Sequence, residues 1–275
     1  MSASGLKPRF KDQNEITVLA DALNTLLNDV ETFRLNLVCL ITQTSVAAVF
    51  RRLAISNILI PIRDVAVEFL EAVSAMWKEV YQFLKQGLQI LRSEPSHKDI
   101  ANAEHHIRAA QVDYLRACQI IETRFEDLLW DSEELLIAEL RGCCGFQFLL
   151  HLTKRFCTLS SYRLIVMEGL PRRFSMLWDD ASEILVCCNY LGEVMSRIQI
   201  RLRSPEWRAY YTGRKDIIEL FRETSLYAEG SHTLIKIRIG LSECRHKTEE
   251  LPIKHEYVGL WDPNEFVWDW YTCWS

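Results

Sequence analysis

The spacing of apolar residues is the feature of this sequence that most restricts its fold. From position 16 onward, apolar side chains recur at steps of three or four: Ile16, Leu19, Leu23, Leu26, Val30, Phe33, Leu37 and Leu40. Because an α-helix turns once every 3.6 residues, this spacing places all of them on one helical face. The sequence therefore predicts a long amphipathic helix that starts near Asp12 and Glu15, where acidic side chains favour a helix N-terminus.

Three further stripes predict helices over residues 69–92, 97–140 and 173–203. Their apolar positions are Phe69, Val73, Met76, Val80, Phe83, Leu84, Leu88 and Leu91; then Ile107, Tyr114, Ile121, Leu128 and Leu135 at a seven-residue repeat, with Leu115, Cys118 and Phe125 beside them; then Leu177, Ala181, Ile184, Cys188, Leu191, Met195, Ile198 and Leu202.

Ser96 and Asp99 resemble a capping box before the third helix. Pro61 suits the first turn of the second helix, and Ser204–Pro205 predicts the end of one helix and the start of another.

Four apolar stripes cannot all face water, so the helices are expected to bury them against one another. Only ten glycines and seven prolines interrupt the 275 residues, which favours long elements over many short strands. We therefore predict an all-α fold, a bundle of long antiparallel helices, with residues 12–228 as the bundle domain.

Residues 229–275 have a different pattern and are predicted to form an aromatic-rich appendage. Ile235, Ile237, Ile239 and Leu241 alternate with polar residues or glycine, which predicts a strand, and residues 252–260 are a candidate partner strand for a hairpin. Four tryptophans follow: Trp261, Trp268, Trp270 and Trp274. Tryptophan dominates interface hot spots, so these four are the predicted partner-binding residues, with docking of the tail on its own bundle as the alternative.

Composition indicates a cytoplasmic protein. The nine cysteines are scattered or directly adjacent, as expected of buried free thiols in a reducing compartment. The polar N-terminus has no apolar stretch typical of a secretory signal. The most apolar run, residues 35–50, contains Asn36 and Gln43 and is short for a membrane span. A net charge of −5 argues against a dedicated nucleic-acid-binding protein.

The string Asp179–Asp180–Ala181–Ser182–Glu183 has carboxylates at the spacing DDxxE. It resembles the aspartate-rich motif of class I terpene synthases, and this resemblance implies carboxylates that bind Mg²⁺ ions holding a substrate diphosphate. No stretch fits the second metal motif of that family, and its C-terminal Arg-Tyr pair is absent. An acidic first turn of a helix explains the same residues, so Asp179, Asp180 and Glu183 are not assigned to a metal.

Other metal and catalytic signals are weaker. Cys143, Cys144, His151 and Cys157 lack the paired spacing of structural zinc sites, as do Cys244, His246, His255 and Cys273. The linear motifs of serine hydrolases, P-loop proteins, dinucleotide-binding proteins and zinc proteases are missing. We therefore predict no catalytic residue, metal or cofactor, and the sequence favours a non-enzymatic protein without deciding the question.

A basic cluster interleaved with aromatic residues lies between positions 197 and 215. It consists of Arg197, Arg201, Arg203, Arg208, Arg214 and Lys215, with Trp207, Tyr210 and Tyr211 among them. The preferred interpretation is pairing with the acidic face of the third helix: Glu122, Glu126, Asp127, Asp131, Glu133 and Glu134. The alternative assigns Arg197, Arg201, Arg208 and Arg214 to binding of phosphate groups or anionic lipid.

The sequence thus predicts a non-catalytic interaction or scaffold protein that binds protein partners through its bundle surface and aromatic tail. A membrane- or phosphate-binding bundle that uses the 197–215 patch is one alternative, and a magnesium-dependent enzyme resembling terpene synthases is another. Protein partners are expected, with anionic lipid and a homodimer as further options and nucleic acid disfavoured.

Overall fold

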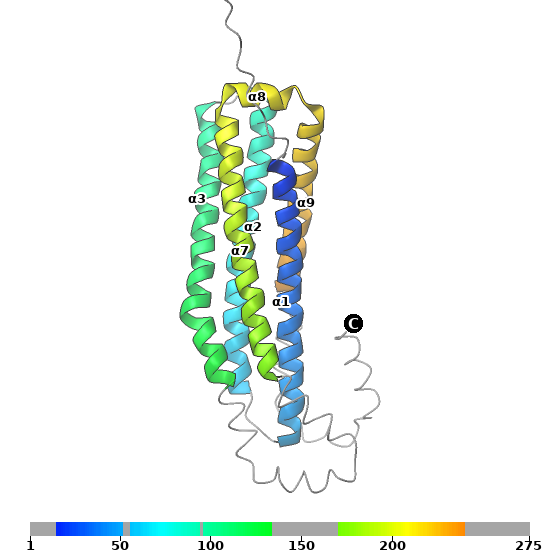
Figure 1. Ribbon diagram of the computed structural model, residues 1–275, viewed down its shortest axis with the longest axis vertical. Coiled ribbons are helices and arrows are strands. Elements are labelled where there is room, and N and C mark those ends of the chain that lie inside the picture. Colours follow the sequence, from blue (N-terminus) through cyan, green and yellow to red (C-terminus); the bar gives the residue numbers. More distant parts are fainter. Residues whose placement is uncertain (1–14, 52–55, 94–95, 134–169, 240–275) are drawn as a thin grey trace, which may run out of the picture. The chain divides into compact units, whose positions relative to one another are not determined.

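The computed structural model describes residues 15–51, 56–93, 96–133 and 170–239. These residues form the helices α1 (Glu15–Arg51), α2 (Ser56–Arg92), α3 (His97–Ile120), α7 (Leu170–Arg203), α8 (Pro205–Thr212) and α9 (Lys215–Ile239) (Figure 1). A short π-helix, η1 (Ile121–Phe125), follows α3, and helical backbone continues to residue 133. The all-α prediction is confirmed: the protein is a bundle of long antiparallel helices.

The apolar stripes explain why these helices pack together. All eight predicted positions of α1, from Ile16 to Leu40, are buried, and so are all eight positions of α7, from Leu177 to Leu202. In α2, Leu88 is half-buried, while the other predicted positions are buried. The face that the 3.6-residue period selects is therefore the face that becomes the core.

The chain divides into two compact units, and each long helix contributes a segment to both. The first unit comprises Met1–Leu27, Ala75–Tyr114 and Val186–Thr233. Within it, α1 contacts α7 through Glu15 with Arg201 and through Ala22 with Cys187, a register that defines an antiparallel pair. The helices α2 and α3 are antiparallel by the same criterion, since Gln86 binds Asp99 and Glu79 binds His106.

Helix α9 completes the first unit by packing on α2 and α1. The indole Nε1 of Trp77 donates a 2.8 Å hydrogen bond to the carbonyl oxygen of Ala228, which gives a fully buried tryptophan a polar partner. Gly87 allows close approach of Phe221, because a Cβ at that position would lie 3.1 Å from Phe221 Cε1. Tyr227 donates to Asn24 Oδ1 of α1 at 3.1 Å.

The second unit comprises Asn28–Ser74, Leu115–Leu185 and Leu234–Ser275. Three fully buried phenylalanines from different helices meet in its core: the ring of Phe33 lies 5.6 Å from that of Phe69 and 5.9 Å from that of Phe125. Aromatic pairs at these separations add to the free energy gained from burial itself.

The π-helix η1 changes which residues of the third stripe face the core. A π-turn contains one residue more than an α-turn, so it rotates everything that follows. After Ile121 the buried positions are Phe125, Leu129 and Ser132, and Leu128 is only half-buried. The predicted seven-residue repeat therefore fails at Leu128, where Leu129 takes the buried position, and Leu135 lies outside the described residues. Leu115 is also misassigned: it is 62% exposed, because it follows Tyr114 by one position and projects roughly 100° away from it.

The predicted helix termini are partly confirmed. Asp99 N–H binds Ser96 Oγ at 3.2 Å and Ser96 N–H binds Asp99 Oδ2 at 2.9 Å, which is the reciprocal geometry of a capping box. Ser204 is extended at the N-cap of α8, and Pro205 follows as its first residue. Helix α2, however, begins at Ser56, so Pro61 lies inside the helix rather than in its first turn.

The strand predicted from Ile235, Ile237, Ile239 and Leu241 is wrong as far as residue 239, because those residues belong to α9. The helical period persists there: Ala228, Ser231 and Ile235 are buried at steps of three and four, and this long-range pattern prevails over a short alternation. Residues 240–275, including the candidate second strand, lie outside the described residues. Helix α9 also runs through position 228, the predicted end of the bundle domain.

Among the helices in the described ranges, none has both the length and the apolar character that crossing a lipid bilayer requires.

Candidate functional site

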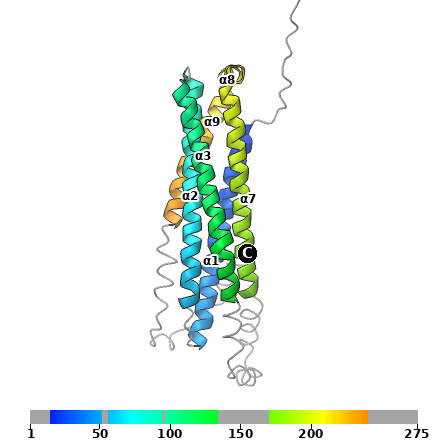
Figure 2. The same cartoon turned by 90° about the vertical axis from the view of Figure 1, so that its left-hand side faces the viewer.

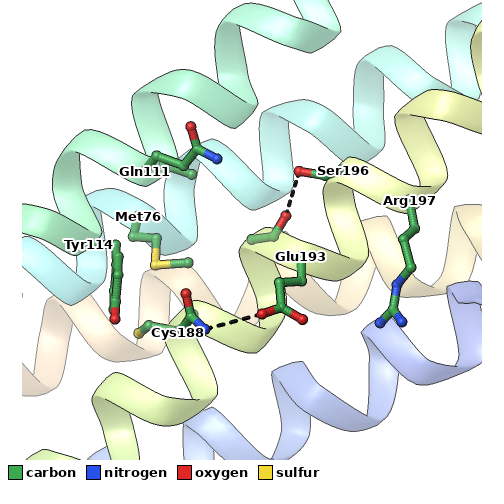
Figure 3. Close-up of a pocket in the computed structure, with 10 residues that line it drawn as sticks. Met76, Gln111, Tyr114, Cys188, Glu193, Ser196 and Arg197 are labelled. Atoms are coloured by element: carbon green, nitrogen blue, oxygen red, sulfur yellow. Dashed lines mark hydrogen bonds between the residues drawn. The ribbon is translucent and has the colours of Figure 1, made fainter.

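A groove of about 360 Å³ lies in the first unit, among α2, α3 and α7. Figure 2 shows α3 facing the viewer with α2 and α7 on either side. Small or apolar residues from the three helices, Met76, Ala110 and Cys188, line the groove together with a polar set: Gln111, Tyr114, Asn189, Glu193, Ser196 and Arg197 (Figure 3). A concave site with a few convergent polar groups is the usual form of a binding site.

Gly192 of α7 helps to keep this groove open. A Cβ at position 192 would meet no atom within 4 Å, so close packing of helices does not explain the glycine. A glycine inside a helix costs about 0.5–1 kcal/mol relative to alanine. Ser196 Oγ donates a 2.9 Å hydrogen bond to the carbonyl oxygen of Gly192, as serine often does four residues along a helix.

Two opposite charges, Glu193 and Arg197, lie one helical turn apart on α7, where both line the groove. Figure 3 shows them extending from the same side of the helix. Glu193 Oε1 accepts from Asn189 Nδ2 at 3.3 Å, and the Arg197 guanidinium lies 5.8 Å from the ring centroid of Tyr190. Both side chains are exposed, and within the described ranges neither forms an ion pair.

The same side of α7 carries three exposed apolar residues. Val186 is 71% exposed, Tyr190 is 41% exposed and Ile200 is 68% exposed. With Glu193 and Arg197 they form a stripe at steps of four, three, four and three, which we call the outer face of α7: Val186, Tyr190, Glu193, Arg197 and Ile200. This is the heptad spacing by which one helix packs along another.

Arg201 of the predicted phosphate-binding set is engaged inside the first unit. Its Nη2 lies 2.7 Å from Glu15 Oε1, its Nη1 donates to the hydroxyl of Tyr211 at 3.3 Å, and its guanidinium lies 4.3 Å from the ring centroid of Trp207. Burial raises the pKa of Glu15, and the positive charges of Arg201 and Arg197 offset only part of this shift. Arg201 therefore joins α1, α7 and α8.

Arg208 and Arg214 also have partners within this unit. Arg208 Nη1 donates to the carbonyl oxygen of Leu202 at 3.2 Å, at the C-terminal end of α7. Arg214 binds Asp216 and holds the pKa of that carboxyl at about 2. Of the four arginines predicted to bind phosphate or lipid, the structure places Arg197 at the groove and uses Arg201 and Arg208 to hold α8.

The predicted pairing of the basic cluster with residues 122–134 is wrong for the two arginines that cross to another helix. Arg201 binds Glu15, and Arg203 binds Glu104, near the opposite end of α3 from those acids. The prediction that these arginines pair with acidic residues of other helices was correct. Linear sequence, however, does not show which turn of a neighbouring helix an arginine contacts.

The DDxxE string lies in the second unit, where Asp180 is used in a buried hydrogen-bond network. Asn36 Nδ2 donates to Asp180 Oδ2 at 2.6 Å, and Arg173 Nη1 donates to Asn36 Oδ1 at 2.9 Å. Burial raises the pKa of Asp180, and the neighbouring carboxylates Glu183, Asp179 and Asp29 raise it further against the effect of Asn36.

This geometry gives the metal hypothesis no support. Asp179 and Glu183 are exposed while Asp180 turns towards Asn36. In the part of the chain that the structure covers, no three His, Cys, Asp or Glu side chains are arranged to hold a metal ion. The predicted partner-binding tryptophans, Trp261, Trp268, Trp270 and Trp274, and both Cys-His groups lie outside the described residues.

Sequence reasoning singled out Arg197 but missed its companions on α7. Tyr190, Glu193 and Ile200 lie on the face opposite the buried stripe and were treated as ordinary surface. A second heptad-spaced stripe on the same helix was the available signal. No protein-family model matches the chain, and comparisons with curated proteins and with solved structures found no match either. The function is therefore inferred from geometry and charge.

Proposed function

We propose that this protein is a non-catalytic helical interaction protein and that the outer face of α7, with the adjoining groove, binds a protein partner. The observation that carries the proposal is the exposure of Val186, Tyr190 and Ile200 at heptad spacing on one helix. Large apolar side chains grouped in this way on an exposed surface mark interaction sites.

The polar members of the outer face support a protein partner over a small apolar ligand. Glu193 and Arg197 sit between the apolar residues, so a partner helix must offer the opposite charges at the matching positions. Such charges determine which partner binds and in which orientation. Ser196, a potential nucleophile in the groove, has its hydroxyl directed to the backbone of its own helix.

The membrane- or phosphate-binding alternative receives less support. Arg201, Arg208 and Arg214 would have to leave the contacts with Glu15, Leu202 and Asp216 to bind a phosphate group. The exchange is most costly at Arg201, because breaking its largely buried pair would leave the Glu15 carboxylate without this partner. The four tail tryptophans remain a proposed second contact, based on the sequence.

Site-specific photo-cross-linking in cells tests the proposal. A photoreactive amino acid replaces Ile200 in one version of the protein and Leu226, another exposed apolar residue, on α9, in the matched control. We expect a discrete cross-linked protein product from position 200 that weakens when Glu193→Arg is added. Equal products from both positions, or a product indifferent to Glu193→Arg, would contradict an interface on the outer face of α7.

A further inference from the structure

We propose that a second copy of this chain occupies the outer face of α7, with the two α7 helices antiparallel about a two-fold axis midway between Glu193 and Arg197. This inference rests on the proposed function and names the partner of that surface. It is carried by the order of four residues along the helix, Tyr190, Glu193, Arg197 and Ile200, which makes this part of the face complementary to itself.

The register follows from heptad geometry. In an antiparallel pair of helices, each position a of one helix packs against a position d of the other. On the outer face of α7, Tyr190 and Arg197 occupy a positions, whereas Val186, Glu193 and Ile200 occupy d positions. An axis between Glu193 and Arg197 places Tyr190 opposite Ile200 of the second copy, and Glu193 opposite Arg197 of the second copy. Each pairing occurs twice, as a two-fold interface requires.

Charge selects this arrangement over a parallel one. In the antiparallel register each Glu193 meets a guanidinium, so two ion pairs form at the centre. A parallel pair would place Glu193 against Glu193 and Arg197 against Arg197, which is repulsive. Within the described residues of a single copy, neither side chain has an ion-pair partner, and Arg197 lies near the ring of Tyr190. Pairing gives each of these two side chains an ion pair in addition to the weaker contacts that it makes within one copy.

The apolar residues flank this centre in a favourable way. Tyr190 and Ile200, exposed in one copy, cover each other at both ends of the contact. An aromatic side chain packed against a branched aliphatic one buries apolar area, while the charges between them keep the contact polar. Because charged residues at a and d positions weaken a helix pair, we expect a dissociation constant in roughly the micromolar range that rises with salt.

Sedimentation velocity of the full chain over a concentration series, with native mass spectrometry in parallel, tests the proposal. We expect a reversible monomer–dimer equilibrium. Glu193→Arg alone and Arg197→Glu alone each place two like-charge pairs at the centre, so each should raise the dissociation constant at least about tenfold. The double variant Glu193→Arg/Arg197→Glu restores opposite charges and should restore the dimer. Glu223→Arg, an exposed charge reversal on α9, is the matched control and should leave the dimer unchanged.

Each remaining outcome counts against a defined part of the proposal. A chain that stays monomeric at about 200 µM, well above the expected micromolar dissociation constant, overturns the dimer. A dimer that resists both single reversals overturns this interface, and a double variant that fails to recover overturns the antiparallel register. Both residues are exposed, so circular dichroism should show unchanged helix content in every variant. If the chain is monomeric but photo-cross-linking from position 200 still captures a different protein, the proposed function stands and only the second copy is excluded.

Discussion

Two arginine networks, one in each unit, differ in their depth of burial, and the difference shows how burial affects charged groups in this bundle. In the first unit, guanidinium groups contact carboxylates directly: Arg201 binds Glu15, and Arg203 binds Glu104. In the second unit, Arg173 is buried and donates to Asn36, which in turn donates to Asp180. Direct arginine–carboxylate pairs also occur in the second unit, for example between Arg34 and Glu31 and between Arg124 and Glu68, so the contrast lies between these two networks.

Comparison of the carboxylates separates the effect of burial from that of pairing. Glu15 and Glu104 both bind an arginine, yet the pKa of Glu15 is raised and that of Glu104 is lowered. The Glu15 side chain is 13% exposed and that of Glu104 is 33% exposed. Desolvation outweighs the arginine in the first case, and hydrogen bonds from Arg108 and Arg203 outweigh it in the second. A nearby cation therefore does not predict the direction of a pKa shift in this protein.

The largest expected effect comes from Arg173→Met in the second unit. The substitution leaves the buried Asn36 Oδ1 without this charge-assisted donor, so we expect the free energy of unfolding to fall by about 3 kcal/mol. Urea denaturation followed by circular dichroism measures this loss.

Arg203→Met is the matched control in the first unit. It breaks an exposed pair with Glu104, which should cost less than about 1 kcal/mol. Equal losses in the two variants would show that depth of burial does not separate the two networks.

Arg201→Met, in the first unit, should have an intermediate effect of about 2 kcal/mol. It removes the contacts with Glu15, Tyr211 and Trp207 together, including a charge-assisted hydrogen bond and a cation–π contact. Because these contacts join α8 to α1 and α7, hydrogen exchange should accelerate most in residues 205–212. Arg201→Lys keeps the charge without the planar guanidinium and should recover only part of the loss. Uniform acceleration across the unit would contradict this local role.

The sequence predicted the features that depend on the helical period of apolar residues. It did not predict the contacts that depend on how distant segments of the chain are aligned. The stripes of α1 and α7 were right at every position, because amphipathic spacing needs only local sequence. The turn η1 was not predictable, since one added residue leaves no sequence signal, and Leu128 was misassigned as a result. The pairs Arg201–Glu15 and Asn36–Asp180 join positions far apart along the chain, where residue type shows that a partner is needed but not which one.

A smaller change in stability is expected for alanine substitutions at two glycines of the first unit, Gly192 and Gly87. Gly192→Ala should stabilise the protein by about 0.5–1 kcal/mol, because alanine favours the helix and the new methyl group meets nothing within 4 Å. Gly87→Ala gains the same helix propensity, but its methyl group would lie 3.1 Å from Phe221 and 3.4 Å from Leu202. We therefore expect it to be at least about 1 kcal/mol less favourable than Gly192→Ala in thermal or urea denaturation. If Gly192→Ala were instead the less stable variant, the space beside Gly192 would be filled in solution, and the groove would be closed.

The smallest expected effect is a pH dependence whose sign differs between two aspartates, Asp29 in the second unit and Asp216 in the first. Burial and the neighbouring Glu183 raise the pKa of Asp29 in the second unit, so the folded state holds this proton more tightly than the unfolded chain does. The resulting destabilisation is complete above the raised pKa and disappears below the ordinary value of about 3.9. Asp29→Asn should therefore stabilise the protein at pH 7 by a few tenths of a kcal/mol, and this gain should vanish on acidification.

Asp216 in the first unit provides the opposite case. Arg214 lowers its pKa to about 2, so its stabilisation is present above the ordinary pKa of about 3.9 and is lost as the pH falls through about 2. Asp216→Asn should accordingly destabilise the protein at pH 7, and the two variants should converge on the parent protein only in acid. Carboxyl NMR titration tests the cause directly: the resonance of Asp29 should titrate above the usual aspartate range and that of Asp216 below it. If both titrate on the same side of that range, burial and pairing do not have the opposite effects proposed for these two carboxyl groups.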